Sequence, residues 1–90
     1  MANQQNELTN IPNIGKVLAQ KLNEVGISTP LELKAVGTEQ TFIRLLAIDN
    51  SVCINMLYAI EGAIQEIRWH QLSTERKQEL LNFFNVCKLK

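Results

Sequence analysis

Few side chains in this 90-residue sequence are of the types that carry out catalysis or hold a metal ion. The chain has one histidine, His70, and two cysteines, Cys53 and Cys87. Their spacing matches no zinc site, because zinc ligands come as closely spaced cysteine and histidine pairs. The sequence also lacks a phosphate-binding loop, a dinucleotide fingerprint and a nucleophile–base pair. We therefore expect no enzyme, no cofactor, no metal and no small-molecule substrate.

A tight turn before a helix is the first pattern that could bind a ligand. The segment IPNIGKVLAQKL (residues 11–22) resembles the hairpin and second helix of a helix-hairpin-helix element, with Asn13 in place of the usual first glycine. Asparagine tolerates the left-handed backbone that such a turn requires. Unpaired N–H groups at a helix N-terminus attract phosphate, and lysine side chains add positive charge. This interpretation assigns nucleic-acid phosphate contacts to Asn13, Gly15, Lys16 and Lys21.

The alternative is that Pro12 and Gly15 only shape a tight start to the helix, with Asn13 as its N-cap. Nine Lys and Arg residues balance nine Asp and Glu residues, so the formal net charge is zero. Nucleic-acid-binding domains usually carry a basic excess, although a local patch can suffice. Both interpretations stay open at this point.

The second pattern is a group of large side chains on the nominally polar side of a helix over residues 51–69. Tyrosine, tryptophan and arginine are enriched at the hot spots of protein–protein interfaces. The sequence therefore indicates a partner-binding surface made of Ile54, Tyr58, Gln65, Arg68, Trp69 and His70. The alternative is that the last helix folds back and covers Trp69, which would place the aromatic residues in the core.

The remaining charged residues and the cysteines have structural explanations. Glu61 lies one turn from Gln65, and we expect it to form an ion pair or to be exposed. The run over residues 75–79 mixes both signs of charge, as a solvated helix face does. Cys53 and Cys87 lie in apolar helical patterns, which favours buried free thiols over a disulfide.

The segment SVCINMLYAIEGAIQEIRW (residues 51–69) also determines the expected fold. Its apolar arc is wider than the ~100° of an ordinary surface helix, so other elements must surround it. Asn55, Glu61 and Gln65 make it too polar to span a bilayer. We predict a compact all-α domain of about five helices around this central apolar helix.

Capping residues delimit the other predicted helices. A first helix over residues 14–25 ends at Gly26, where Ile27 can contact Leu22 in a Schellman-type stop. Thr29 caps a short helix that ends at Gly37, with Glu32 closing a capping box. Two more helices cover residues 39–48, capped by Thr38, and 74–86, capped by Ser73. No segment alternates with period two, so no sheet is predicted.

The length and composition fit one globular domain. The hydrophobic fraction is 46%, and the sequence contains no secretory h-region and no membrane-spanning run. We divide the chain into a flexible polar leader, residues 1–7, and a helical domain, residues 8–90. We expect it in the cytoplasm, without contact to a membrane.

Several segments together resemble one bacterial family. IPNIGKVLAQKLNEVGISTPLELKAVG, followed by SVCINMLYAIEGAIQEIRWHQL, is similar to the C-terminal domain of the TfoX family, also called Sxy. Its most specific parts are the PNIGK turn, the TP and EL pairs after Ile27, the LYA and EGA triplets and the IRWH segment. The resemblance covers about residues 8–84.

The resemblance implies a compact helical fold related to helix-hairpin-helix domains, and a role in regulating competence for DNA uptake. It implies a transcription factor as partner, and the residues add self-association as a possibility. The family supplies no catalytic or ligand residues to carry over. The resulting hypothesis is a non-enzymatic regulatory module that acts through protein–protein contact, and the alternative is a non-specific DNA-binding module.

Overall fold

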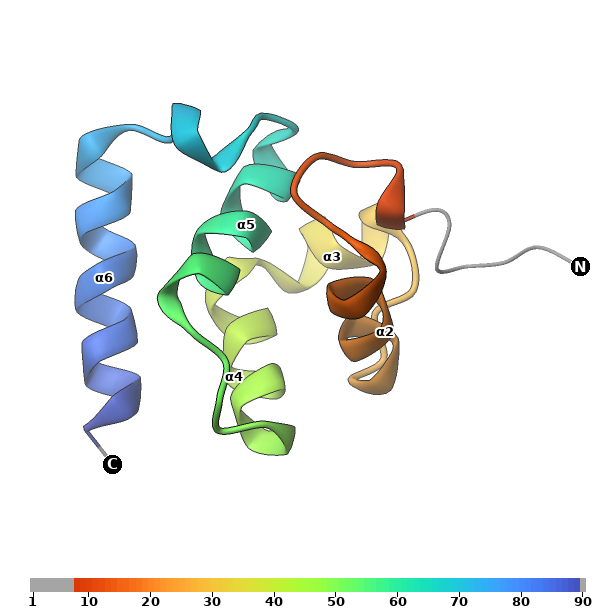
Figure 1. The fold of residues 1–90 in the computed structure, drawn as a ribbon, viewed down its shortest axis with the longest axis horizontal. Helices are drawn as coiled ribbons and strands as arrows, with labels where there is room; N and C mark the ends of the chain where they lie inside the picture. Colours follow the sequence, from red (N-terminus) through yellow and green to blue (C-terminus); the bar gives the residue numbers. More distant parts are fainter. Residues whose placement is uncertain (1–7, 90) are drawn as a thin grey trace, which may run out of the picture.

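The structure, a computed structural model, describes residues 8–89, and within this range it contains helices and no strand (Figure 1). The α-helices are α2 (Lys16–Glu24), α3 (Pro30–Val36), α4 (Thr38–Ile48), α5 (Ile54–Gln65) and α6 (Thr74–Lys88), and the 3-10 helix η1 covers Trp69–Gln71. The prediction of an all-α domain is confirmed. The predicted leader, residues 1–7, lies outside the described residues. No helix of the described part is long and apolar enough to cross a bilayer.

Helix α5 occupies the centre of the domain, as predicted. It packs against α3, α4, η1 and α6, with α6 on one side and α2 on the other side of the view in Figure 1. Leu57, Ile60 and Ala63 of α5 have no exposed surface. They meet Phe42 of α4 and Leu80 of α6, which are also completely buried. Burial of such side chains contributes about 1.5–3 kcal/mol each, so this contact carries much of the stability.

Local signals set the helix ends that were predicted correctly. Gly26 has φ 87°, and the Ile27 N–H donates to the Leu22 carbonyl at 2.9 Å, which is the predicted Schellman stop. At the start of α3, the Thr29 hydroxyl accepts from the Glu32 N–H at 3.1 Å. Ser73 also caps α6, as predicted, through its side-chain hydroxyl group.

Two predicted caps are wrong. Helix α2 begins at Lys16 with Gly15 as its N-cap, so Asn13 lies before the cap and does not serve as one. Helix α4 includes Thr38 as its first residue, and Gly37, with φ 87°, precedes it as the N-cap. In both cases the side chain predicted as a cap instead forms a hydrogen bond with another part of the chain.

The central helix is shorter than predicted, because α5 ends at Gln65 and does not continue to Trp69. Glu66 adopts a left-handed conformation with φ 61°. The Ile67 N–H then donates to the Gly62 carbonyl at 2.9 Å, closing a second Schellman-type stop. This stop has glutamate at the position where glycine is usual, so the local sequence did not indicate it.

The side chain of Asn13 joins the N-terminal turn to the segment just beyond this stop. Its Nδ2 donates to the Ile67 carbonyl at 2.8 Å, and its Oδ1 accepts from the Trp69 N–H at 3.1 Å. Asn13 has φ 73°, so the left-handed conformation expected from the sequence is present. Gly62 leaves room for this amide, since a Cβ there would lie 2.5 Å from the Asn13 Nδ2 and 2.9 Å from the Ile67 carbonyl oxygen.

We predict that Gly62→Ala destabilises the domain. The added methyl group must displace either the Asn13 amide or the Ile67 carbonyl, and overpacking of this kind costs about 1–3 kcal/mol. That cost opposes a gain of up to ~1 kcal/mol from the higher helix propensity of alanine. Urea denaturation followed by circular dichroism should therefore give a net loss in the free energy of unfolding.

Gly15→Ser is the matched control. A Cβ at Gly15 meets no atom within 4 Å, and serine is a good N-cap. This variant should be as stable as the parent chain or slightly more stable. A Gly62→Ala variant that gains the full ~1 kcal/mol of helix propensity would mean that the Asn13 contact contributes nothing.

Candidate interaction surfaces

The structure brings Tyr58, Trp69 and His70 together in one stacked cluster. The Tyr58 and Trp69 ring centroids are 5.7 Å apart with an interplanar angle of 16°. The Trp69 and His70 centroids are 4.0 Å apart at 27°. Tyr58 and Trp69 are partly buried and His70 is exposed. We call Tyr58, Trp69, His70 and the neighbouring Arg68 the aromatic surface.

The predicted contact between Tyr58 and Trp69 exists, but its geometric reason differs from the prediction. The two residues do not share one helix. They meet because the chain turns at Glu66 and η1 folds back beside α5. Helix α6 covers Trp69 only in part. This side chain is therefore neither fully exposed, as in a free partner-binding surface, nor fully buried in the core.

The other residues predicted for this surface have different environments in the structure. Arg68 is exposed, and its side chain forms no ion pair with any described residue. Gln65 is exposed too, but its amide donates to the Glu61 carboxylate. Ile54 is partly buried and packs against the core. Arg68 therefore belongs with the stacked rings, whereas Gln65 and Ile54 have structural contacts.

Lys77 contacts the aromatic surface, and this contact was not predicted from the sequence. Its Nζ lies 5.7 Å from the Trp69 ring centroid, in cation–π geometry, and donates to the His70 carbonyl at 3.5 Å. Lys77 lies in the mixed-charge run that was interpreted as a solvated helix face. The available signal was its position one turn after the Ser73 cap, on a helix that had to return past Trp69.

The start of α2 is open but carries less free charge than expected. Gly15 and Lys16 are exposed, and no side chain caps the helix. Lys21 is a turn further on, and its ammonium pairs with Asp49 at 2.6 Å. Asn13 is committed to its contact with residues 67 and 69. Of the four predicted phosphate ligands, Gly15 and Lys16 therefore remain accessible.

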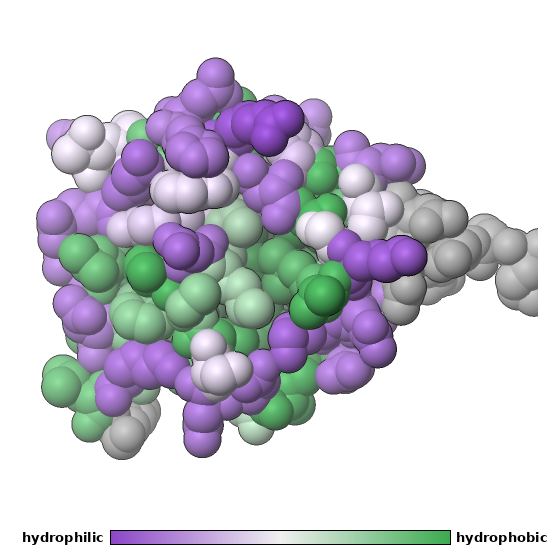
Figure 2. Space-filling view, viewed as in Figure 1, coloured by the Kyte–Doolittle hydropathy of each residue, from purple (hydrophilic) through white to green (hydrophobic). Residues whose placement is uncertain are grey.

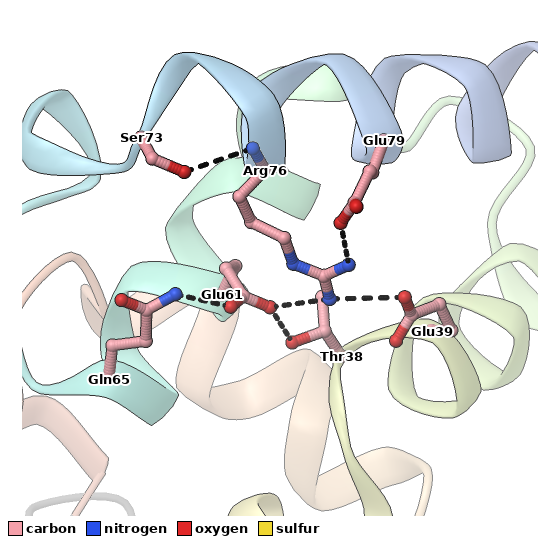
Figure 3. A network of polar contacts seen from close by, with 7 residues as sticks. All are labelled: Thr38, Glu39, Glu61, Gln65, Ser73, Arg76 and Glu79. Atoms are coloured by element: carbon pink, nitrogen blue, oxygen red, sulfur yellow. Dashed lines mark hydrogen bonds and ion pairs between the residues drawn. The ribbon is translucent and has the colours of Figure 1, made fainter.

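A network of polar side chains around Glu61 connects three helices (Figure 3). Glu61 of α5 is 7% exposed and accepts from the Thr38 hydroxyl of α4 at 2.6 Å. Arg76 of α6 reaches Glu61 at 2.9 Å, and it also pairs with Glu39 at 3.0 Å and with Glu79 at 3.1 Å. The ion pair expected for Glu61 is confirmed. The expectation that residues 75–79 form a purely solvated face is wrong for Arg76, which is partly buried.

The network keeps both of its central groups charged. Burial would raise the pKa of Glu61, but hydrogen bonds from Arg76, Thr38 and Gln65 outweigh it and lower that pKa below its usual value. The hydrogen bond to Glu61 raises the pKa of Arg76, against the opposing effect of burial. Glu61 and Arg76 therefore form a structural ion pair.

The cysteines are free thiols, as predicted, but they are less buried than predicted. Cys53 is exposed because α5 begins only at Ile54, which leaves Cys53 as the N-cap, and Cys87 is partly buried. No cluster of three or more potential metal ligands exists among residues 8–89.

Apolar side chains also gather on the protein surface. Figure 2 shows them in the middle of one face, roughly where Figure 1 draws α5, with polar side chains around them. Exposed apolar patches of this kind often mark binding surfaces.

Comparisons with known proteins agree with this fold. The family model of the TfoX C-terminal domain matches residues 4–84. Protein Sxy of Escherichia coli K12 is 33% identical over 78 residues, which make up 87% of this chain and 37% of that protein. This chain therefore spans little more than a third of that relative.

Two crystal structures from Listeria monocytogenes are similar as well. One, of an uncharacterized protein in a triclinic form, is 51% identical with a TM-score of 0.89, over 90% of this chain and 92% of that one. The other, of a protein of unknown function in a tetragonal form, is 51% identical with a TM-score of 0.84, over 92% and 98%. The arrangement of helices described above thus also occurs in experimental structures.

We predict that Arg76→Ala destabilises the domain far more than Arg44→Ala. Removing Arg76 leaves the buried Glu61 carboxylate without its counter-charge, and breaking a buried pair costs about 3–5 kcal/mol. We expect the low end of this range, because the Arg76 side chain is 26% exposed. Arg44 makes one exposed hydrogen bond to the Val25 carbonyl, so its loss should cost less than about 1 kcal/mol. Equal losses in urea denaturation would contradict this role for the network.

Acid should destabilise the domain. The pKa values of Glu61, Asp49 and Glu66 all lie below their usual values, the latter two through hydrogen bonds from Lys21 and Lys34. A carboxyl with a lowered pKa contributes stability above its unfolded value of about 4, and this stability is lost as the pH falls through the folded value. The free energy of unfolding, measured from pH 6 down to about pH 3, should therefore decrease.

The variant Glu61→Gln should be less stable at pH 7 and should show a shallower acid slope. If Glu61→Gln keeps the full slope, the lowered pKa of Glu61 does not cause the loss of stability in acid.

Proposed function

This chain belongs to the family of TfoX C-terminal domains, and we propose that it is a non-enzymatic regulatory module that acts by binding a protein partner. The observation that carries the proposal is the aromatic surface. It combines partly buried rings with an unpaired arginine, which is the composition of interface hot spots. Tyr58 and Trp69 supply contact area, and Arg68 supplies a charge that is free among the described residues.

The supporting structure makes this surface rigid. The backbone of Trp69 is fixed by the Asn13 amide, and its ring stacks with those of Tyr58 and His70. A surface that is already ordered loses little conformational entropy on binding, so more of its contact energy becomes affinity. This preorganisation supports a binding role for the surface beyond its contribution to the core.

The family relation supports a role in regulation. We propose that the chain takes part in regulating competence for DNA uptake, in the bacterial cytoplasm, with a transcription factor as its partner. Because the chain covers 37% of protein Sxy, such a role for this chain is an inference from the family. The net charge of zero is compatible with a partner that is a protein.

A second candidate function is non-specific binding of DNA phosphates at the start of α2. The favourable observation is the open N-terminus at Gly15, with no capping side chain and Lys16 beside it. The pairing of Lys21 with Asp49 reduces the charge available there. A helix-hairpin-helix relationship would favour this second function, and it remains a prediction from the sequence.

The two candidates can be separated in a chimera. We predict that this chain, replacing the matching 78-residue segment of E. coli protein Sxy, activates a competence-gene reporter in a strain lacking that protein. Arg68→Glu should reduce activation strongly, because losing a hot-spot side chain costs about 2 kcal/mol or more, or roughly 30-fold in affinity. Circular dichroism of the isolated variant should show unchanged stability, since Arg68 is exposed and unpaired.

Lys16→Glu is the matched control, an exposed charge reversal at the other candidate surface. Under the protein-binding proposal it leaves activation unchanged. Loss of activation with Lys16→Glu and retention with Arg68→Glu would reverse the order of the two candidates. If the chimera is active and neither variant reduces activation, both surfaces are excluded.

A further inference from the structure

A hollow lined by apolar side chains lies between the C-terminal halves of α4 and α6. It has a volume of about 430 Å³ and is lined by Ile43, Leu46, Ala47, Phe83, Val86 and Cys87. Ile43 is 42% exposed and Val86 is 60% exposed. These side chains therefore offer apolar surface to the solvent in a concave place, where a bound molecule could cover it.

A second hollow of about 350 Å³ adjoins the first and is lined by Leu46, Asn50, Cys87 and Lys88. The two hollows share Leu46 and Cys87 in their linings, so they lie next to each other, and we call them together the α4–α6 groove. Its first part is lined by carbon and sulfur side chains, and its second part contains an ammonium and an amide. A molecule that fits both parts has an apolar body and a polar end.

The charge of that polar end follows from Lys88. Its Nζ donates to the Asn50 carbonyl at 2.6 Å and lies 5.7 Å from the Phe84 ring centroid, so the ammonium is held beside the groove. An ammonium has three donors, and this bond uses one of them. No carboxylate lines either hollow, and Lys88 forms no ion pair within the described part of the chain. Among the described residues, no carboxylate therefore compensates the positive charge that Lys88 offers to an anion in the groove.

The size of the groove indicates a small occupant. A stable protein–protein interface takes about 20–30 residues from each side, far more than line the groove. Small-molecule pockets have volumes of roughly 300–1,000 Å³ and are mostly apolar with a few polar groups. The volume and the lining of the α4–α6 groove both lie in this class.

We propose that the α4–α6 groove binds a single-chain amphiphile with an anionic head group, of the type of a medium-chain fatty acid. The hydrocarbon chain lies along Ile43, Ala47 and Val86, and excludes water from them. The carboxylate accepts hydrogen bonds from the free donors of Lys88. This site is separate from the aromatic surface and does not depend on the function proposed for that surface.

The two cysteines provide a direct test in the unmodified protein. Cys87 lines both hollows, whereas Cys53 is exposed and lines neither. The probe is sodium decanoate below its micelle concentration, and the measurement is the alkylation rate of each thiol by mass spectrometry. At ten times the dissociation constant, the rate at Cys87 should fall about tenfold, because about one tenth of the protein is then free. The rate at Cys53 should not change.

Three variants test the assignment of the groups. Lys88→Glu should abolish protection by decanoate but keep protection by decanol, which has the same chain without the charge. Ala47→Trp fills the apolar part and should abolish protection by both. Ala35→Trp, at an exposed alanine of α3, is the matched control and should keep both.

Several results would overturn the proposal. One is that decanoate does not protect Cys87, or that it slows both thiols equally. Another is that Lys88→Glu has no effect, which would exclude the anionic head group. A dimer in sedimentation experiments that dissociates in the Ala47→Trp variant would assign the groove to a second copy of the chain instead.

Discussion

A carboxylate placed on the most buried helix of a small domain has to be compensated, and this requirement fixes how the helices meet. Glu61 lies in the middle of α5 and is almost completely buried. Its Oε1 accepts from Thr38 of α4 and from Arg76 of α6, and its Oε2 accepts from Gln65 of α5. The ion pair and its hydrogen bonds add directional contacts to the apolar packing of α6 on α5, and these contacts favour the observed register. The position of α6 in turn brings Lys77 over Trp69 and places Phe83 beside α4.

The parts of the fold that were predictable from the sequence are those with local causes. The stop at Gly26 and the cap at Thr29 depend on residues within one helical turn, so spacing reveals them. The end of α5 has a distant cause, because Asn13 binds the backbone just beyond Glu66. Nothing near Glu66 resembles a stop signal. The sequence therefore predicts that a central helix exists, but not where it ends.

The candidate sites also differ in whether their contacts have local or distant causes in the sequence. The meeting of Tyr58 and Trp69 was predicted for a continuous helix, and the structure achieves it with a turn and a 3-10 helix. The pairing of Lys21 with Asp49 could not be predicted, because 28 positions separate the two residues, whereas the contact of Lys77 with Trp69 depends on the path of the loop before α6. Apolar periodicity locates helices and their buried sides. The pairing of surface charges depends on distances between helices, which periodicity does not contain.

The hydrogen bonds of Asn13 also determine when the aromatic surface can exist during synthesis. They connect residues 54 and 56 positions apart, so they close only after residue 69 has left the ribosome. Contacts of such long sequence separation form late, because the loop between them must first be ordered by its own local structure. A nascent chain that already contains α2, α3 and α4 therefore lacks the surface at Trp69. A partner that recognises this surface would therefore not bind a chain whose synthesis has not yet passed residue 69.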